Sequence, residues 1–383
     1  MSASPRNRSL RRDRLRLRQL FRADAVAVRQ SLVALVVSAL TAVVAGVLLA
    51  SITDTLEELP GLLLLVPAAI ALRGNVFGAL GSRLGTAIHT GTFVLRLRSD
   101  TVVGQNVIAS IVLSLVTSVG VAVIAKGVAI AFAISPVMSL AEFIVVSVVG
   151  GLLASSLVLL ISLLLAAGSV RFEWDLDNVT APLVTATGDL VTVPALLVAT
   201  WLLGGQAQST VIAAVSAVLA IVGLILVARS SLDLMRRIVQ ESLPVLLLAG
   251  LLDLIAGITV QKRQDDFLAF EALLILLPGF LGAAGALGGI LSSRLATGFH
   301  LGLVEPAPVP TRVARSDMRS VLALALPVFA VLGIASWVAA ELGGFTDPGL
   351  FRLVAVALTA GVLATGFVIG VGYYGTLAAV RLG

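Results

Sequence analysis

The chain of 383 residues contains no cysteine and only two histidines. Disulfides and thiolate metal sites are therefore excluded, and a zinc cluster built from cysteine and histidine is not expected. Any metal that binds here must accept oxygen ligands. The sequence also lacks a phosphate-binding glycine loop and a recognisable nucleophile beside a base. We therefore predict that the protein is not an enzyme and holds no cofactor.

Charged residues are scarce as well. They make up 12% of the chain, against about 25% in globular proteins, while 58% of residues are hydrophobic and the mean hydropathy is +1.09. This composition predicts an all-α membrane protein, because a backbone inside a bilayer must satisfy its own hydrogen bonds. Apolar runs of bilayer length, roughly 20 residues each, lie near 31–52, 60–82, 105–125, 140–167, 181–203, 209–228, 242–260, 268–293, 320–340 and 350–378.

The basic residues are unevenly distributed. Nine of the 26 lysines and arginines lie in residues 1–30. We expect this segment to be a solvated cytoplasmic tail that meets the anionic headgroups of the cell membrane, rather than a nucleic-acid-binding segment. A cytoplasmic N-terminus places 21 basic residues inside and four outside, as the positive-inside rule requires.

A segment of the chain recurs without a gap 211 positions later. Residues 67–91 match residues 278–302, and upstream Gly46 matches Gly257. The repeated unit is therefore a bundle of helices. Identical residues in the first copy include Pro67, Gly74, Gly78, Ser82, Arg83, Leu84, Thr86, His89 and Gly91.

The repeat predicts the domain organisation. Residues 31–204 form a first repeat of five helices, 205–240 a linker helix and cytoplasmic loop, and 241–383 a second repeat. Because five is odd, the linker helix is needed to keep both repeats the same way up, related by a pseudo-twofold axis along the membrane normal. A polar pathway is expected between the two repeats.

Several residues inside the spans are candidates for function. Gly74 and Gly78 have the spacing of tight helix packing. Arg73 and Asp253 lie near the bilayer centre, where charges are costly and usually paired, so we expect a cross-repeat ion pair between them. Asp189 lies about 10 Å into its span by helical rise. A carboxylate at that depth indicates a cation pathway, a structural salt bridge or a protonated acid.

In combination these motifs resemble the MgtE-like magnesium transporters, including the solute-carrier branch with two such units in tandem. The resemblance extends from about residue 31 to the end. It depends on Pro67, Gly74, Asn75, Ser82, Arg83 and Leu84, followed by Asp175, Leu176, Asp177, Asn178, Pro182, Gly188 and Asp189.

The resemblance implies a magnesium route with Asp189 at the ion site. Asn75, the backbone at Gly74 and the Thr185 hydroxyl are then expected as further contacts. The cytoplasmic mouth would hold Asp175, Asp177 and Asn178. Magnesium is a hard ion that dehydrates reluctantly, so one or two carboxylates can hold it through its water shell.

The chain departs from the family pattern in three places. Leu176 replaces the usual proline, and Ala286 stands opposite Asn75. The equivalent of Asp189 would fall beyond Gly383, so the second repeat is expected to lack its last helix. Either the reading frame is incomplete, or the end is natural and transport needs a second chain, as in a homodimer, or fails. We predict divalent-cation transport, chiefly of magnesium. The alternatives are a secondary carrier for a small organic or anionic substrate and a non-transporting membrane scaffold.

Overall fold

The computed structural model describes residues 31–172 and 176–382, with side chains for 31–172 and 183–381. All regular structure within these residues is helical, and ten of the helices are long and apolar enough to cross a membrane. The prediction of an all-α, multi-pass membrane protein is therefore confirmed. The ten long helices are Ser31–Ala50, α3 (Leu62–His89), α4 (Val102–Ala131), α5 (Leu140–Phe172), α6 (Leu176–Thr200), α7 (Gln206–Arg229), α8 (Asp233–Lys262), α10 (Glu271–His300), α11 (Arg312–Gly343) and α12 (Leu350–Leu382).

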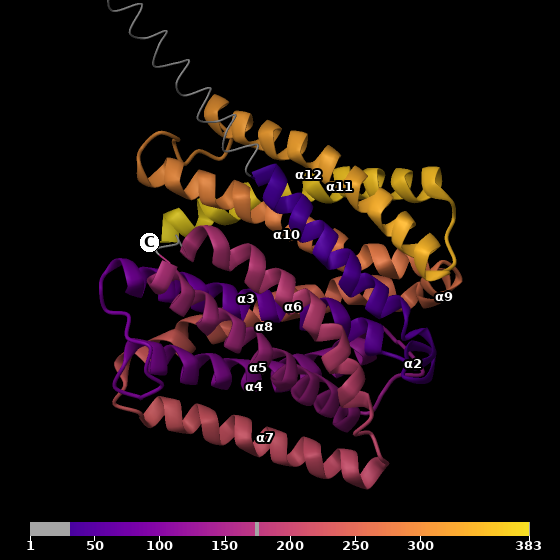
Figure 1. Ribbon diagram of the computed structural model, residues 1–383, viewed down its shortest axis with the longest axis horizontal. Helices are drawn as coiled ribbons and strands as arrows, with labels where there is room; N and C mark the ends of the chain where they lie inside the picture. The colour runs from indigo at the N-terminus through magenta and orange to yellow at the C-terminus, as the bar shows by residue number, and fades with distance from the viewer. Residues whose placement is uncertain (1–30, 173–175, 383) are drawn as a thin grey trace, which may run out of the picture.

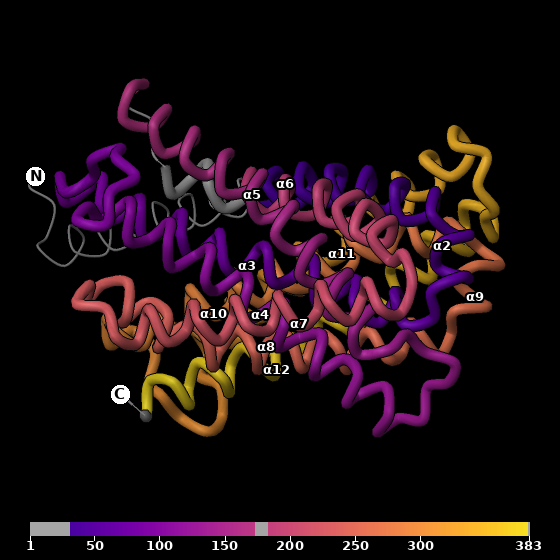
Figure 2. The backbone as a smooth tube through the Cα atoms, turned by 90° about the horizontal axis from the view of Figure 1, so that it is seen from below, coloured from indigo at the N-terminus to yellow at the C-terminus, as the bar shows by residue number. Residues whose placement is uncertain are grey.

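The long helices run side by side along the long axis of the molecule, as Figure 2 shows from below. The two short helices, α2 (Thr53–Glu58) and α9 (Gln264–Ala269), precede α3 and α10. Both lie at the same end of the bundle (Figure 1). Helix α7 lies at the outer edge, where it packs on α4 and α5 (Figure 1).

Close contacts between the two repeats are reciprocal. A Cβ atom on Gly46, in the first helix, would collide with the carbonyl of Ile275 in α10. A Cβ atom on Gly257, in α8, would collide with the carbonyl of Leu64 in α3. The two pairs are equivalent at the offset of 211, so the first helix of each repeat packs on the second helix of the other. Such a contact, made twice by equivalent residues, is the pattern of a twofold interface.

Helices α3 and α10 are longer than their apolar runs. They continue to His89 and His300, whereas hydropathy predicted ends near 82 and 293, because polar residues can extend a helix beyond its apolar part. Arg83 therefore lies inside α3, where its Nε donates to Oδ1 of Asn106 at 2.7 Å. The equivalent Arg294 donates to Oδ1 of Asp317 at 3.1 Å. Each pair joins two consecutive helices of one repeat.

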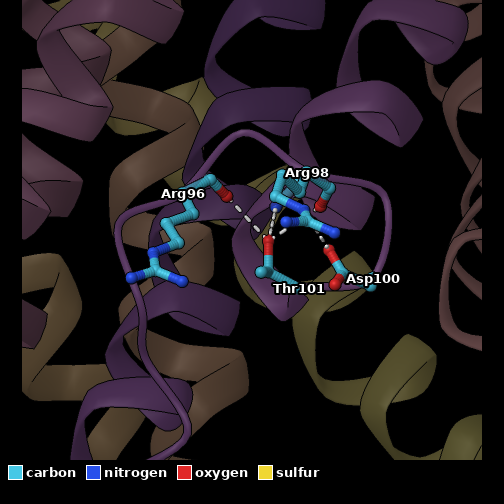
Figure 3. Close-up of polar contacts among 5 residues, drawn as sticks. Arg96, Arg98, Asp100 and Thr101 are labelled. Atoms are coloured by element: carbon cyan, nitrogen blue, oxygen red, sulfur yellow. Dashed lines mark hydrogen bonds and ion pairs between the residues drawn. The ribbon is translucent and has the colours of Figure 1, made fainter.

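The loop before α4 is held by Thr101 (Figure 3). The Thr101 hydroxyl accepts from the Gly104 amide at 3.0 Å and lies within donating distance of the carbonyls of Arg96, at 2.7 Å, and Arg98, at 2.8 Å. Asp100 forms an exposed ion pair with Arg98 at 3.2 Å. The cap satisfies an amide that the helix leaves free and so fixes where α4 begins.

Candidate functional site

A cavity of about 400 Å³ lies where the two repeats meet. Helices α3 and α6 of the first repeat and α8 and α10 of the second line it. Four pairs of its lining residues are equivalent at the offset of 211: Ile70 with Leu281, Ala71 with Gly282, Gly74 with Gly285, and Asn75 with Ala286. We call it the central cavity. Its polar lining consists of Asn75, Thr185, Asp189 and Asp253.

Asp189 is buried in the wall of the central cavity. Its side chain is 3% exposed, and Oδ2 has no hydrogen-bond partner. This oxygen is 3.8 Å from the position that a Cβ atom on Gly282 would occupy, so it faces the second repeat. A buried carboxylate oxygen without a donor is costly. The water shell of a hydrated cation could donate to this oxygen.

Gly188 determines how closely α6 approaches α3. A Cβ atom on Gly188 would lie 3.3 Å from the Cβ of Arg73, which is tighter than an ordinary contact. Thr192, one turn further along, donates its hydroxyl to the Gly188 carbonyl at 2.5 Å. Because Asp189 is next to this contact point, its side chain is held at the edge of α3 and reaches the central cavity.

The structure brings four of the predicted site residues together. Asp189, Asn75, Gly74 and Thr185 all line the central cavity. The predicted cytoplasmic mouth remains a prediction, because Asp175 lies outside the described residues. The side chains of Asp177 and Asn178, at the start of α6, lie outside them too.

The repeated glycines do not have the predicted packing role. A Cβ atom on Gly74, Gly78, Gly285 or Gly289 would meet nothing within 4 Å. Gly74 and Gly285 instead give the central cavity its width. Among the described residues, Gly46 and Gly257 are the glycines at which a Cβ atom would meet the backbone of the other repeat. A spacing of four residues places both glycines on one face of the helix. It does not tell whether another helix packs against that face or a cavity adjoins it.

The predicted ion pair between Arg73 and Asp253 is wrong. Arg73 is 2% exposed, its Nε has no hydrogen-bond partner, and its guanidinium lies beside Ser118 and Gly151, between α3, α4 and α5. Asp253 lines the central cavity instead. Asn75, which lines the cavity, follows Arg73 by two positions, and this spacing turns their side chains about 160° apart on a helix. Depth in the bilayer is readable from sequence, but the direction of a side chain around its helix is not.

A second cavity, of about 410 Å³, continues from the first. Asn75 lines both, and the second also contains Arg83, Glu241 and Ser242. The lining residues of α3 include Ala71, Asn75, Ala79 and Arg83, which are spaced four positions apart along one face of the helix. The cavities therefore lie end to end along the contact between α3 and α8. Between Pro67 and Arg83 they extend about 24 Å by helical rise.

Among the described residues, no group of three or more histidine, aspartate or glutamate side chains is placed to hold a metal ion. A bare metal ion bound entirely by protein side chains is therefore not supported by this part of the chain. A hydrated ion is different, because it needs only one or two carboxylates around its water shell. The central cavity has the chemistry of such an outer-sphere site.

The profile of the MgtE family, described as "Divalent cation transporter", matches residues 66–199 and 277–383, more than half of the chain. The chain belongs to the MgtE family. The two matched segments of this MgtE chain begin 211 positions apart, the offset found in the sequence repeat.

Two curated relatives carry the name solute carrier family 41 member 3. The protein from Rattus norvegicus is 24% identical over 273 residues, which are 68% of this chain and 56% of the relative. The protein from Mus musculus is 23% identical over 270 residues, 68% of this chain and 53% of the relative. The MgtE chain thus spans little more than half the length of these relatives. No solved structure matches it.

Proposed function

We propose that the chain transports divalent cations, magnesium in particular, across the cell membrane through the central cavity between its two repeats. The observation that carries the proposal is the buried, unpartnered Oδ2 of Asp189 at the meeting point of the repeats. Membership in a family described as divalent cation transporters supports the same function.

The size of the central cavity suits a hydrated ion. Six waters occupy about 180 Å³ at the density of the liquid, well within the cavity's volume of about 400 Å³. Magnesium prefers octahedral oxygen ligands and dehydrates reluctantly, so it can enter with its waters and be held through them. The described lining of the cavity contains no lysine or arginine, which disfavours the alternative of an anionic substrate.

The proposed route continues from Asn75 into the second cavity, beside Arg83 and Glu241. We place this end of the route and residues 1–30 in the cytoplasm, because basic residues concentrate there. Residues 31–204 and 241–383 are proposed as the two repeats, with 205–240 as linker. Contact of the tail with anionic lipid and assembly into a homodimer stay predictions.

Magnesium flux into proteoliposomes tests the proposal. We expect the purified protein to admit magnesium to a trapped indicator dye, and Asp189→Asn to lower the rate to that of empty liposomes. Asp233→Asn is the matched control, because Asp233 is exposed at the start of α8 and, within the described part of the chain, pairs with Arg236 alone, at 2.8 Å. Unchanged flux in the Asp189 variant would contradict the proposed site, and absence of flux in the unmodified protein would contradict the function.

A further inference from the structure

The central cavity holds a second carboxylate, which belongs to the second repeat. Asp253 of α8 lines the cavity together with Asp189 of α6. It is half-buried and, among the described residues, makes no hydrogen bond or ion pair. The equivalent position in the first repeat is Ala42, so this acid is particular to one side of the site.

The packing of α8 explains why Asp253 is turned toward the cavity. Leu252 and Ile255 are 60% and 44% exposed on the outer face of α8, where their apolar side chains can contact lipid. Leu254 is fully buried, and Gly257 packs against the backbone of α3. Asp253 lies between these two faces, on the side where Ala256 also lines the cavity.

Two carboxylates that face one cavity without a basic partner repel each other, and each is costly inside a bilayer. Asp189 lines the cavity from one side, and its buried Oδ2 has no hydrogen-bond partner and faces Gly282 of α10, which lines the same cavity. Arg73 does not relieve this repulsion, because its guanidinium lies on the other side of α3. A divalent cation between the two acids would neutralise both.

We propose that Asp253 is the second carboxylate of the cation site and holds the water shell of the ion together with Asp189. The inference rests on the proposed function, since it assigns a further ligand to the same site. Both repeats then form the site, with one acid from α6 and one from α8.

The absence of cysteine allows binding to be measured without transport. Ala256→Cys places a single thiol in the wall of the central cavity and leaves both acids in place. We expect a charged methanethiosulfonate reagent to modify this thiol, and magnesium to slow the reaction by occupying the site. In this background Asp253→Asn should raise the half-protecting magnesium concentration about 10- to 100-fold, the loss typical when an outer-sphere partner of a metal is removed.

Two controls define the result. Asp233→Asn, on the same helix but outside the cavity, should leave the half-protecting concentration unchanged. Leu252→Cys, on the outer face of α8, should react at a rate that magnesium does not alter. If Asp253→Asn does not yield a monodisperse protein, Asp253→Ser removes the same charge with a smaller side chain and should shift protection equally.

The outcomes separate this inference from the function on which it rests. If Asp189→Asn weakens protection and neither neutral variant of Asp253 does, the role of Asp253 is overturned and the site at Asp189 stands. If magnesium never protects Ala256→Cys, or no acid variant alters protection, both are overturned. If neutralising either acid raises the half-protecting magnesium concentration, the shared site is supported.

Discussion

Within the described residues, a helix fills the groove beside the second helix of the first repeat, whereas the groove beside the second helix of the second repeat is open. In the first, α6 packs against both α3 and α5. In the second, α10 and α12 line an open groove of about 660 Å³, with Ala284, Gly288 and Ser292 on one wall. Within the described residues, the first repeat contributes its cavity acid from α6 and the second repeat contributes its acid from α8.

At single positions, the two repeats agree in some places and differ in others. Positions that pack the helices agree between the repeats, as Gly46 and Gly257 do. Polar positions inside the spans differ: Asn75 and Asp253, which line the central cavity, correspond to Ala286 and Ala42, and Arg73, which lies away from the cavity, corresponds to Ala284. A nearly twofold scaffold thus carries an asymmetric site, because packing depends on the shape that the repeats share while ion binding depends on a few polar groups.

The largest effect on the shared scaffold is expected at its reciprocal contacts. Gly46→Ala and Gly257→Ala each place a Cβ atom against a backbone carbonyl of the other repeat, which cannot move aside as a side chain can. We expect each to cost about 3 kcal/mol, the upper range for overpacking, and to lower the midpoint of thermal unfolding in detergent. Gly289→Ala, which meets open space, should be neutral or stabilising. Unequal losses at Gly46 and Gly257 would contradict the twofold relation.

A smaller effect, on flux rather than stability, is expected in the central cavity. Gly74→Val and Gly285→Val should leave thermal stability unchanged, because a Cβ atom meets nothing at either position. They should still narrow the cavity and lower magnesium flux by about tenfold, equivalent to a barrier of about 1.4 kcal/mol. Gly289→Val is the matched control, since it carries the same substitution outside the cavity. Normal flux through both cavity variants would argue for a different route.

The smallest effect should distinguish the two arginine pairs. Asp317→Asn gives Arg294 the neutral acceptor that Arg83 has in Asn106. Since a charge-assisted hydrogen bond is roughly twice as strong as a neutral one, we expect a loss of about 1 kcal/mol. Asp100→Asn removes an exposed pair and should change little. Equal effects of the two substitutions on thermal unfolding would show that partial burial adds nothing to the Arg294 pair.

Much of the fold was predictable because its signals are local. All ten spans were identified by hydropathy, and the offset of 211 recurs in the reciprocal glycine contacts. The helix ends were less accurate, because residues such as Arg83 continue a helix without being apolar. In the candidate site, depth in the span and the family motif single out Asp189. Depth also marks Asp253 as a costly charge, but it does not predict that Asp253 lines the central cavity and makes no pair with Arg73.

The sequence by itself determined that this protein is a helical membrane protein built from two related repeats, since apolar length and a fixed offset are properties of the chain alone. Only the tertiary structure decided what its polar residues face. The direction of a side chain around a helix depends on which neighbour packs where. For that reason Arg73 lies among α3, α4 and α5, Gly74 borders open space, and Asp189 and Asp253 share one cavity.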